Sequence, residues 1–118
     1  MAIEFLTSQP NSLLAKFDAA VTQAEPKGKI TTWEKSDDEI YYTHKAAEWR
    51  KKAWLKPTAM TDRLVFNIIR PQNANISSLV YAYYHGHLIE TFLNHFDEIF
   101  TQGIATALPT REDRCSAT

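Results

Sequence analysis

Two of the four histidines, His85 and His87, form a His-x-His pair that could bind a metal ion. On a continuous strand, residues i and i+2 point to the same side and can share a ligand. Gly86 lies where we expect a strand to give way to a helix, which would break that shared direction. If the helix begins near His87, His95 lies about 12 Å further along its axis, too far to bind the same ion. We therefore interpret these histidines as polar junction residues and predict no metal site.

A histidine could also act as a general acid or base without any cofactor. His44 and His85 are the candidates, because each is expected at the end of a strand. The simpler interpretation, which we favour, is that both are solvent-exposed residues at strand ends. A cofactor-independent enzyme that uses one of them remains the first alternative function.

The glycine and cysteine contents exclude several kinds of site. The three glycines are dispersed along the chain, whereas a phosphate-binding loop or a dinucleotide fingerprint needs several of them between a strand and a helix. The single cysteine, Cys115, can form neither an internal disulfide nor a cysteine-based zinc site. No Gly-x-Ser-x-Gly segment marks a nucleophilic serine. We predict no cofactor.

Residues 45–56 combine basic side chains with Trp49 and Trp54. Single-strand nucleic-acid binders interleave aromatic and positive residues in this way. The formal net charge of the chain is −1, however, so no global field attracts nucleic acid. Lysines that protect an edge strand explain the segment equally well. Nucleic-acid binding is therefore a second alternative, and it requires the basic residues to share one surface with an exposed tryptophan.

The elements that must position these residues follow from hydrophobic periodicity. Apolar residues at helical spacing predict a helix over residues 11–24. Alternation with a period of two predicts strands over residues 30–35, 39–44, 63–69 and 76–84. Residues 45–60 are ambiguous, and we interpret them as a loop or helical turn followed by an edge strand.

The clearest signal is an amphipathic helix that follows residue 87 and ends at Gly103. Its apolar residues fall within an arc of about 140°: Leu88, Ile89, Phe92, Leu93, Phe96, Ile99 and Phe100. We predict an α+β fold with an N-terminal helix, an antiparallel sheet of four or five strands and this C-terminal helix, both helices lying on one sheet face. Residues 1–108 form one domain, and residues 109–118 form a flexible polar tail that folding does not require.

Alternation along the strands predicts a second, aromatic sheet face that the helices do not cover. Such a face is too apolar for open water and too polar for a dry core. We expect this face to supply interface or ligand-binding residues, namely Trp33, Tyr41, Trp54, Asn67, Tyr81, Tyr83 and His85. Self-association with Tyr81 and Tyr83 at the seam is favoured over coverage by a long loop or by the N-terminal arm (Ile3, Phe5 and Leu6).

The sequence therefore predicts a small homodimeric binding or interaction module. A small apolar or aromatic ligand is a second expected partner, in a cleft lined by the sheet aromatics. No stretch approaches the ~20 apolar residues of a membrane-spanning helix, and the first residues do not resemble a signal peptide. We expect a cytoplasmic protein with no membrane partner.

Overall fold

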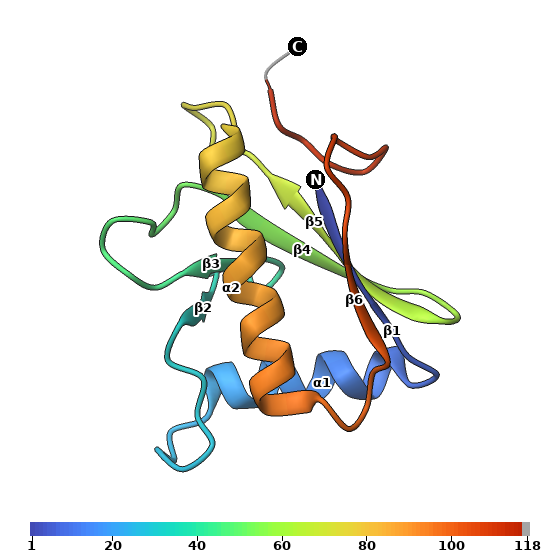
Figure 1. Ribbon diagram of the computed structural model, residues 1–118. Coiled ribbons are helices and arrows are strands. Elements are labelled where there is room, and N and C mark those ends of the chain that lie inside the picture. Colours follow the sequence, from blue (N-terminus) through green and yellow to red (C-terminus); the bar gives the residue numbers. More distant parts are fainter. Residues whose placement is uncertain (117–118) are drawn as a thin grey trace.

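Two helices cover one face of a six-stranded antiparallel sheet in the computed structural model, which describes residues 1–116 (Figure 1). Along the chain the elements are β1 (Ala2–Leu6), α1 (Pro10–Thr22), β2 (Trp33–Lys35), β3 (Tyr42–His44), β4 (Trp54–Ala59), β5 (Arg63–Ile69), α2 (Ser78–Phe96) and β6 (Gln102–Ala105). The order across the sheet is β2-β3-β4-β5-β1-β6. The predicted α+β class is confirmed, with more strands than expected. Neither described helix is long and apolar enough to cross a bilayer.

Two predicted strand regions are confirmed. The strands β2 and β3 form the predicted hairpin and pair with each other, so that Trp33 lies opposite His44. The strand predicted over residues 63–69 is β5. The residues of β5 at alternate positions, Leu64, Phe66 and Ile68, are fully buried beneath the helices, as its alternating pattern requires.

The strand β4 lies inside the sheet, so its expected position at an edge is wrong. It pairs with β5 along its whole length and with β3 through Leu55 alone. The remainder of β4 therefore has no strand neighbour on its β3 side within the described residues. Pro57 lies in that stretch, where a missing backbone N–H interrupts no ladder with β3. Residues 46–52, which precede β4, form turns.

The N-terminal arm forms a strand within the sheet and does not fold over the second face. Ile3 and Phe5 in β1 are fully buried, and β1 pairs with β5 on one side and with β6 on the other. Five residues at the chain terminus carry too short an alternation to distinguish a strand from an arm. Their position in the sheet comes from pairing with distant segments.

The strand predicted over residues 76–84 is wrong, because most of that segment is the first half of α2. Ser77 caps the helix through its side-chain oxygen, which accepts a hydrogen bond from the Val80 N–H at 3.1 Å. The buried residues Tyr81, Tyr84, Leu88 and Phe92 recur at helical spacing. The β-branched and aromatic residues favour a strand locally, and burial of this stripe overrides that preference.

The helix α2 ends at Phe96, which corrects the predicted end at Gly103. Gly103 lies in β6 instead, and a Cβ atom at this position would approach the Phe5 ring to 3.4 Å. Gly103 therefore packs closely against β1 within β6 and does not end a helix.

Four phenylalanines from different elements join the helices to the sheet. Phe5 of β1 stacks on Phe92 of α2 with ring centroids 4.0 Å apart. Phe17 of α1 lies 5.6 Å from Phe66 of β5 and 5.1 Å from Phe92. All four side chains are fully buried. The core thus depends on all of these elements at once, which is typical of a single small domain.

The expected free tail is corrected as far as Cys115, because residues 110–115 dock on the domain. Arg114 forms a parallel bridge with Ile69, at the end of β5 that extends beyond β1. The Asp113 carboxylate is buried and accepts hydrogen bonds from the Asn67 amide at 2.8 Å and from the Ile68 N–H at 3.1 Å. It also lies 3.2 Å from the amino group of Met1. These contacts are polar, so hydrophobic periodicity contains no signal for them.

Candidate functional site

Three adjoining clefts follow the sheet face that the helices leave uncovered. The largest, of about 750 Å³, is lined by residues that include Tyr41, Trp54 and Ile69. It shares Tyr41 and Ile69 with a second cleft of about 250 Å³. That one shares Asn67, Thr58 and Glu112 with a third, of about 480 Å³. We refer to the three together as the sheet trough.

Alternation along β4 and β5 creates the floor of the sheet trough. Trp54, Lys56 and Thr58 alternate with residues that point to the covered face, and Trp54 lies opposite Ile69 on β5. Tyr41, just before β3, packs against Trp54 with ring centroids 6.4 Å apart in an edge-on arrangement. Both rings remain partly exposed. One end of the trough is therefore aromatic and accessible.

Two lysines beside these rings have charges that nothing within residues 1–116 neutralises. Lys51 lines the aromatic cleft and Lys56 lines the middle one, and neither forms an ion pair among the described residues. Arg70 and Arg114 also line these clefts, but each donates hydrogen bonds to backbone carbonyls. The lysines are the groups that remain available to an anion.

Acidic side chains occupy two positions on the rim. The hydroxyl of Ser36 and the backbone N–H of Ile40 both donate to the Asp38 carboxylate and lower its pKa. Glu112 lies at the junction of the second and third clefts. The trough is thus mixed in charge, with the two unpaired lysines near its aromatic end and Glu112 further along.

Three of the residues expected at a ligand site or interface, Tyr41, Trp54 and Asn67, line the sheet trough. The Asn67 amide is occupied by Asp113. The sequence analysis assigned Lys51 and Lys56 to a possible nucleic-acid segment and not to the ligand site, and it missed the wall formed by residues 110–114. The period of two that joins Trp54 to Lys56 could have identified Lys56, whereas the docking of the tail has no signal in the sequence.

The other predicted interface residues lie away from the uncovered sheet face, so the proposed tyrosine seam is corrected. Tyr81 is buried on α2 and donates a hydrogen bond to the Thr106 carbonyl at 2.6 Å. Tyr83, also on α2, stacks on Trp49 with centroids 3.9 Å apart. The buried indole of Trp33 donates to the Thr91 hydroxyl at 3.0 Å. All three side chains therefore make their contacts within the subunit. The two tyrosines do so because they lie on a helix and not on the sheet.

His44 is a buried residue and not the exposed strand-end residue that was expected. Its Nδ1 accepts a hydrogen bond from the Ala46 N–H at 3.0 Å, so the proton lies on Nε2, 3.4 Å from Nδ1 of His87. Burial, and secondarily the nearby His87, lowers the pKa of His44. Aromatic rings pack around it, including Trp33 at 5.2 Å. Among the described residues its ring-nitrogen neighbours are the Ala46 N–H and His87, and no ion pair with a carboxylate joins it.

His85 projects from α2, and its Nε2 is buried without a hydrogen-bond partner in the described chain. Burial, and secondarily the chain's amino group, lowers the pKa of His85. Two residues apart on a helix, His85 and His87 differ in direction by about 200°, so they cannot share an ion. No group of three metal-binding side chains occurs within residues 1–116.

The basic residues of segment 45–56 make different contacts. Arg50 forms an ion pair with Glu34 at 2.5 Å, and Lys52 lies over the Trp49 ring at 5.4 Å. Only Lys51 and Lys56 reach the sheet trough with Trp54. Nucleic-acid binding through this segment stays a prediction, with Lys52 beside Trp49 and with Lys51 and Lys56 beside Trp54 as the groups that would carry it.

No protein family, characterised protein or solved structure that was compared with the chain matches it. Function must therefore be argued from the site, because a fold alone does not specify one. In this chain the site with the most accessible chemistry is the sheet trough.

Proposed function

We propose that this chain is a binding module that holds a small ligand with a flat ring and an acidic group in the sheet trough. The observation that carries the proposal is the aromatic pair of Trp54 and Tyr41 beside the unpaired Lys51 and Lys56. Partly exposed aromatics with nearby free cations favour a ligand that is apolar on one side and anionic on the other.

The spacing on β4 indicates the size of such a ligand. Trp54 and Lys56 are two residues apart on one strand, so their Cα atoms lie about 6–7 Å apart on the same face. A ring packed against Trp54 and Tyr41 would place an attached carboxylate, sulfonate or phosphate within reach of Lys56. An acidic group placed in the third cleft would instead meet Glu4 and Glu112 and no lysine, which favours its placement beside Lys56.

Binding is better supported than the alternative of acid–base catalysis by a histidine. Neither His44 nor His85 lines any of the three clefts. The proposed role needs only groups that are already accessible. A homodimer stays part of the proposal, and the burial of Tyr81 and the stacking of Tyr83 on Trp49 favour a seam that lies elsewhere.

The test uses 8-anilinonaphthalene-1-sulfonate, which combines flat rings with one negative charge, and its neutral relative N-phenyl-1-naphthylamine. Wild-type protein should bind the sulfonate saturably, with shifts in the amide and indole NMR signals of Trp54 and its neighbours. Replacing Trp54 with Ala should weaken binding of both probes about fivefold or more, because aromatic packing contributes ~1 kcal/mol or more.

Lys56→Glu should weaken the sulfonate about three- to tenfold and leave the neutral probe nearly unchanged, as expected for a partly exposed charge contact. Lys27→Glu is the matched control, because it makes the same charge change in the loop after α1 and lines none of the clefts. Equal weakening by the two lysine variants would show a general charge effect. Shifts that map away from Trp54, or unsaturable binding, would remove the trough from consideration.

A further inference from the structure

The strand β6 is a short edge of the sheet that carries no charged residue and no proline to protect it against pairing. It ends the strand order, so no described strand pairs with its outer side. Residues 99–110 contain no charged side chain. Edge strands are commonly protected by lysines, prolines within the strand or a covering segment. The only proline nearby, Pro109, lies beyond the end of β6.

The outer backbone groups of β6 belong to Gly103 and Ala105. The Thr106 N–H faces inward, because it donates to the Ala2 carbonyl at 3.0 Å. Inward and outward groups alternate along an antiparallel strand, so those of Gly103 and Ala105 face away from β1. Both residues are exposed. Their N–H and C=O groups are available to another strand.

The outward N–H and C=O groups of β6 are complementary to those of a second β6. If a second β6 lies antiparallel about a two-fold axis through Ile104, Gly103 of each copy faces Ala105 of the other. Every outward donor then faces an outward acceptor, because residues that share a hydrogen-bonded pair exchange both bonds. An isologous interface of this kind closes after two copies.

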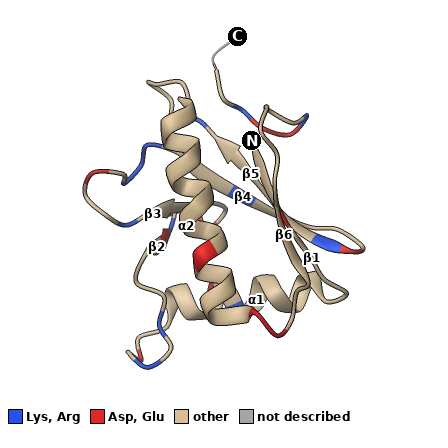
Figure 2. Cartoon of the chain, in the orientation of Figure 1, with Lys and Arg blue, Asp and Glu red and all other residues tan. Residues whose placement is uncertain are grey.

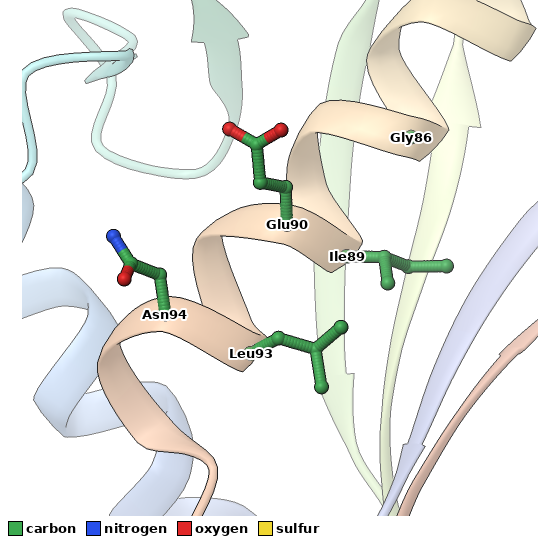
Figure 3. Close-up of a pocket in the computed structure, with 5 residues that line it drawn as sticks. All are labelled: Gly86, Ile89, Glu90, Leu93 and Asn94. Atoms are coloured by element: carbon green, nitrogen blue, oxygen red, sulfur yellow. The ribbon is translucent and has the colours of Figure 1, made fainter.

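The outer face of α2 provides apolar surface next to the same edge. Gly86, Ile89 and Leu93 line an open hollow of about 630 Å³, together with Glu90 and Asn94 (Figure 3). Leu93 is 54% exposed. In Figure 3, Ile89 and Leu93 point to one side of the helix, whereas Glu90 and Asn94 point to the other. Ile89 lies against Gly103, where a Cβ would approach it to 3.8 Å, so the apolar side of α2 adjoins β6.

We infer that a second copy of this chain docks on β6, extending the sheet across a two-fold axis and packing the two α2 helices against each other through Leu93. The absence of a large side chain at Gly86 would let the helices approach closely. The cartoon of β6 has no charged residue and that of α2 has one acidic position, Glu90 (Figure 2), so pairing would bury few charges.

The opposite edge of the sheet explains why the partner is a second β6. The edge strand β2 has three residues, two of them charged, and Glu34 holds an ion pair with Arg50. Pairing of β6 with β2 would bury those charges and would propagate into an open chain of molecules. Pairing of β6 with itself avoids both consequences. It also leaves the aromatic end of the sheet trough uncovered, so this inference does not rest on the proposed function.

The test measures molar mass by light scattering and sedimentation from low to high micromolar concentration. Wild-type protein should reach twice the 13.5 kDa of the monomer. Ala105→Pro removes an outward N–H, and Leu93→Lys places a charge on the apolar side of α2. Each should weaken the dimer about tenfold or more. Leu79→Lys is the matched control, because Leu79 is exposed on the same helix but does not line the hollow.

Amide hydrogen exchange provides a readout at β6 itself. The Gly103 and Ala105 amides should exchange more slowly at high than at low protein concentration, and Leu93→Lys should abolish that difference. If Ala105→Pro prevents folding, Leu93→Lys still tests the inference, because Leu93 is exposed to solvent and its replacement should leave the fold intact. A wild-type monomer at every concentration overturns the inference. So does a dimer that resists both variants, or one disrupted equally by Leu79→Lys.

Discussion

Replacing Asp113 with Ala should destabilise the domain strongly, although the residue lies in a polar segment near the C-terminus. Its carboxylate accepts hydrogen bonds from the Asn67 amide, the Ile68 N–H and the backbone and hydroxyl of Thr110. The side chain of Asp113 is fully buried. Without it, the donors of Asn67 and Ile68 lose their acceptor beneath the docked tail.

An unsatisfied buried donor costs about 1–3 kcal/mol. The two donors are those of Asn67 and Ile68. Because the tail can loosen and admit water, we expect the loss of the Asp113 carboxylate to lower the free energy of unfolding by about 2–4 kcal/mol in total, near the low end for two donors. At roughly 4 °C per kcal/mol for a domain of this size, the melting temperature should fall by about 8–16 °C. Asp113→Asn retains the shape and one acceptor, so it should fall between the wild type and Asp113→Ala.

Thermal melting followed by circular dichroism is the assay, with Glu112→Ala as the matched control. Glu112 is exposed, and among residues 1–116 its one ion pair is with the exposed Arg111 at 3.9 Å, so its loss should change stability by no more than ~0.5 kcal/mol. If Asp113→Ala melts together with Glu112→Ala, the tail is dispensable, as its polar sequence suggests, and the reasoning from its hydrogen bonds is refuted.

Two further predictions concern the core and the histidines. Phe92→Ala should cost about 3–5 kcal/mol, because Phe92 is fully buried against Phe5. Phe96→Ala should cost less, since Phe96 is only partly buried at the end of α2, and chemical denaturation that ranks them in the opposite order would contradict this packing. Burial lowers the pKa values of His44 and His85 in the folded state, so the unfolded chain binds more protons below pH ~6.5. The free energy of unfolding should therefore fall as the pH falls through that value. His44→Gln should make this dependence on pH less steep. Equal melting temperatures above and below pH ~6.5 would contradict the prediction.

Hydrophobic periodicity correctly predicted the helices and strands that bury one face and expose the other. The β5 strand and the first helix have a strong periodicity, and the buried side of β5 followed from alternation at Leu64, Phe66 and Ile68. The hairpin of β2 and β3 followed from a turn-forming run between two alternating segments. In each case the residues that specify the element are neighbours in the sequence.

The errors concern segments whose structure depends on distant contacts. Val80, Tyr81, Tyr83 and Tyr84 have the composition of a strand, and the cap at Ser77 that opens α2 is one serine among several plausible turn residues. That single error moved the tyrosines onto the sheet and produced the wrong seam. Likewise, Gly103 is as suitable for ending a helix as for packing β6 against Phe5, and only the three-dimensional arrangement distinguishes these roles.

The position of β1 between β5 and β6 has a consequence for the order in which the chain can fold. Glu4 pairs with Val65 on one side and with Ile104 on the other, partners that follow it by about 60 and about 100 residues, so the mean sequence separation of native contacts is high. During synthesis β1 emerges about 60 residues before its first strand neighbour and about 100 residues before its second. We therefore expect slow folding for a domain of this size. Until β6 is in place, the exposed edge of β1 is the part of the nascent chain that is most prone to pair with other molecules.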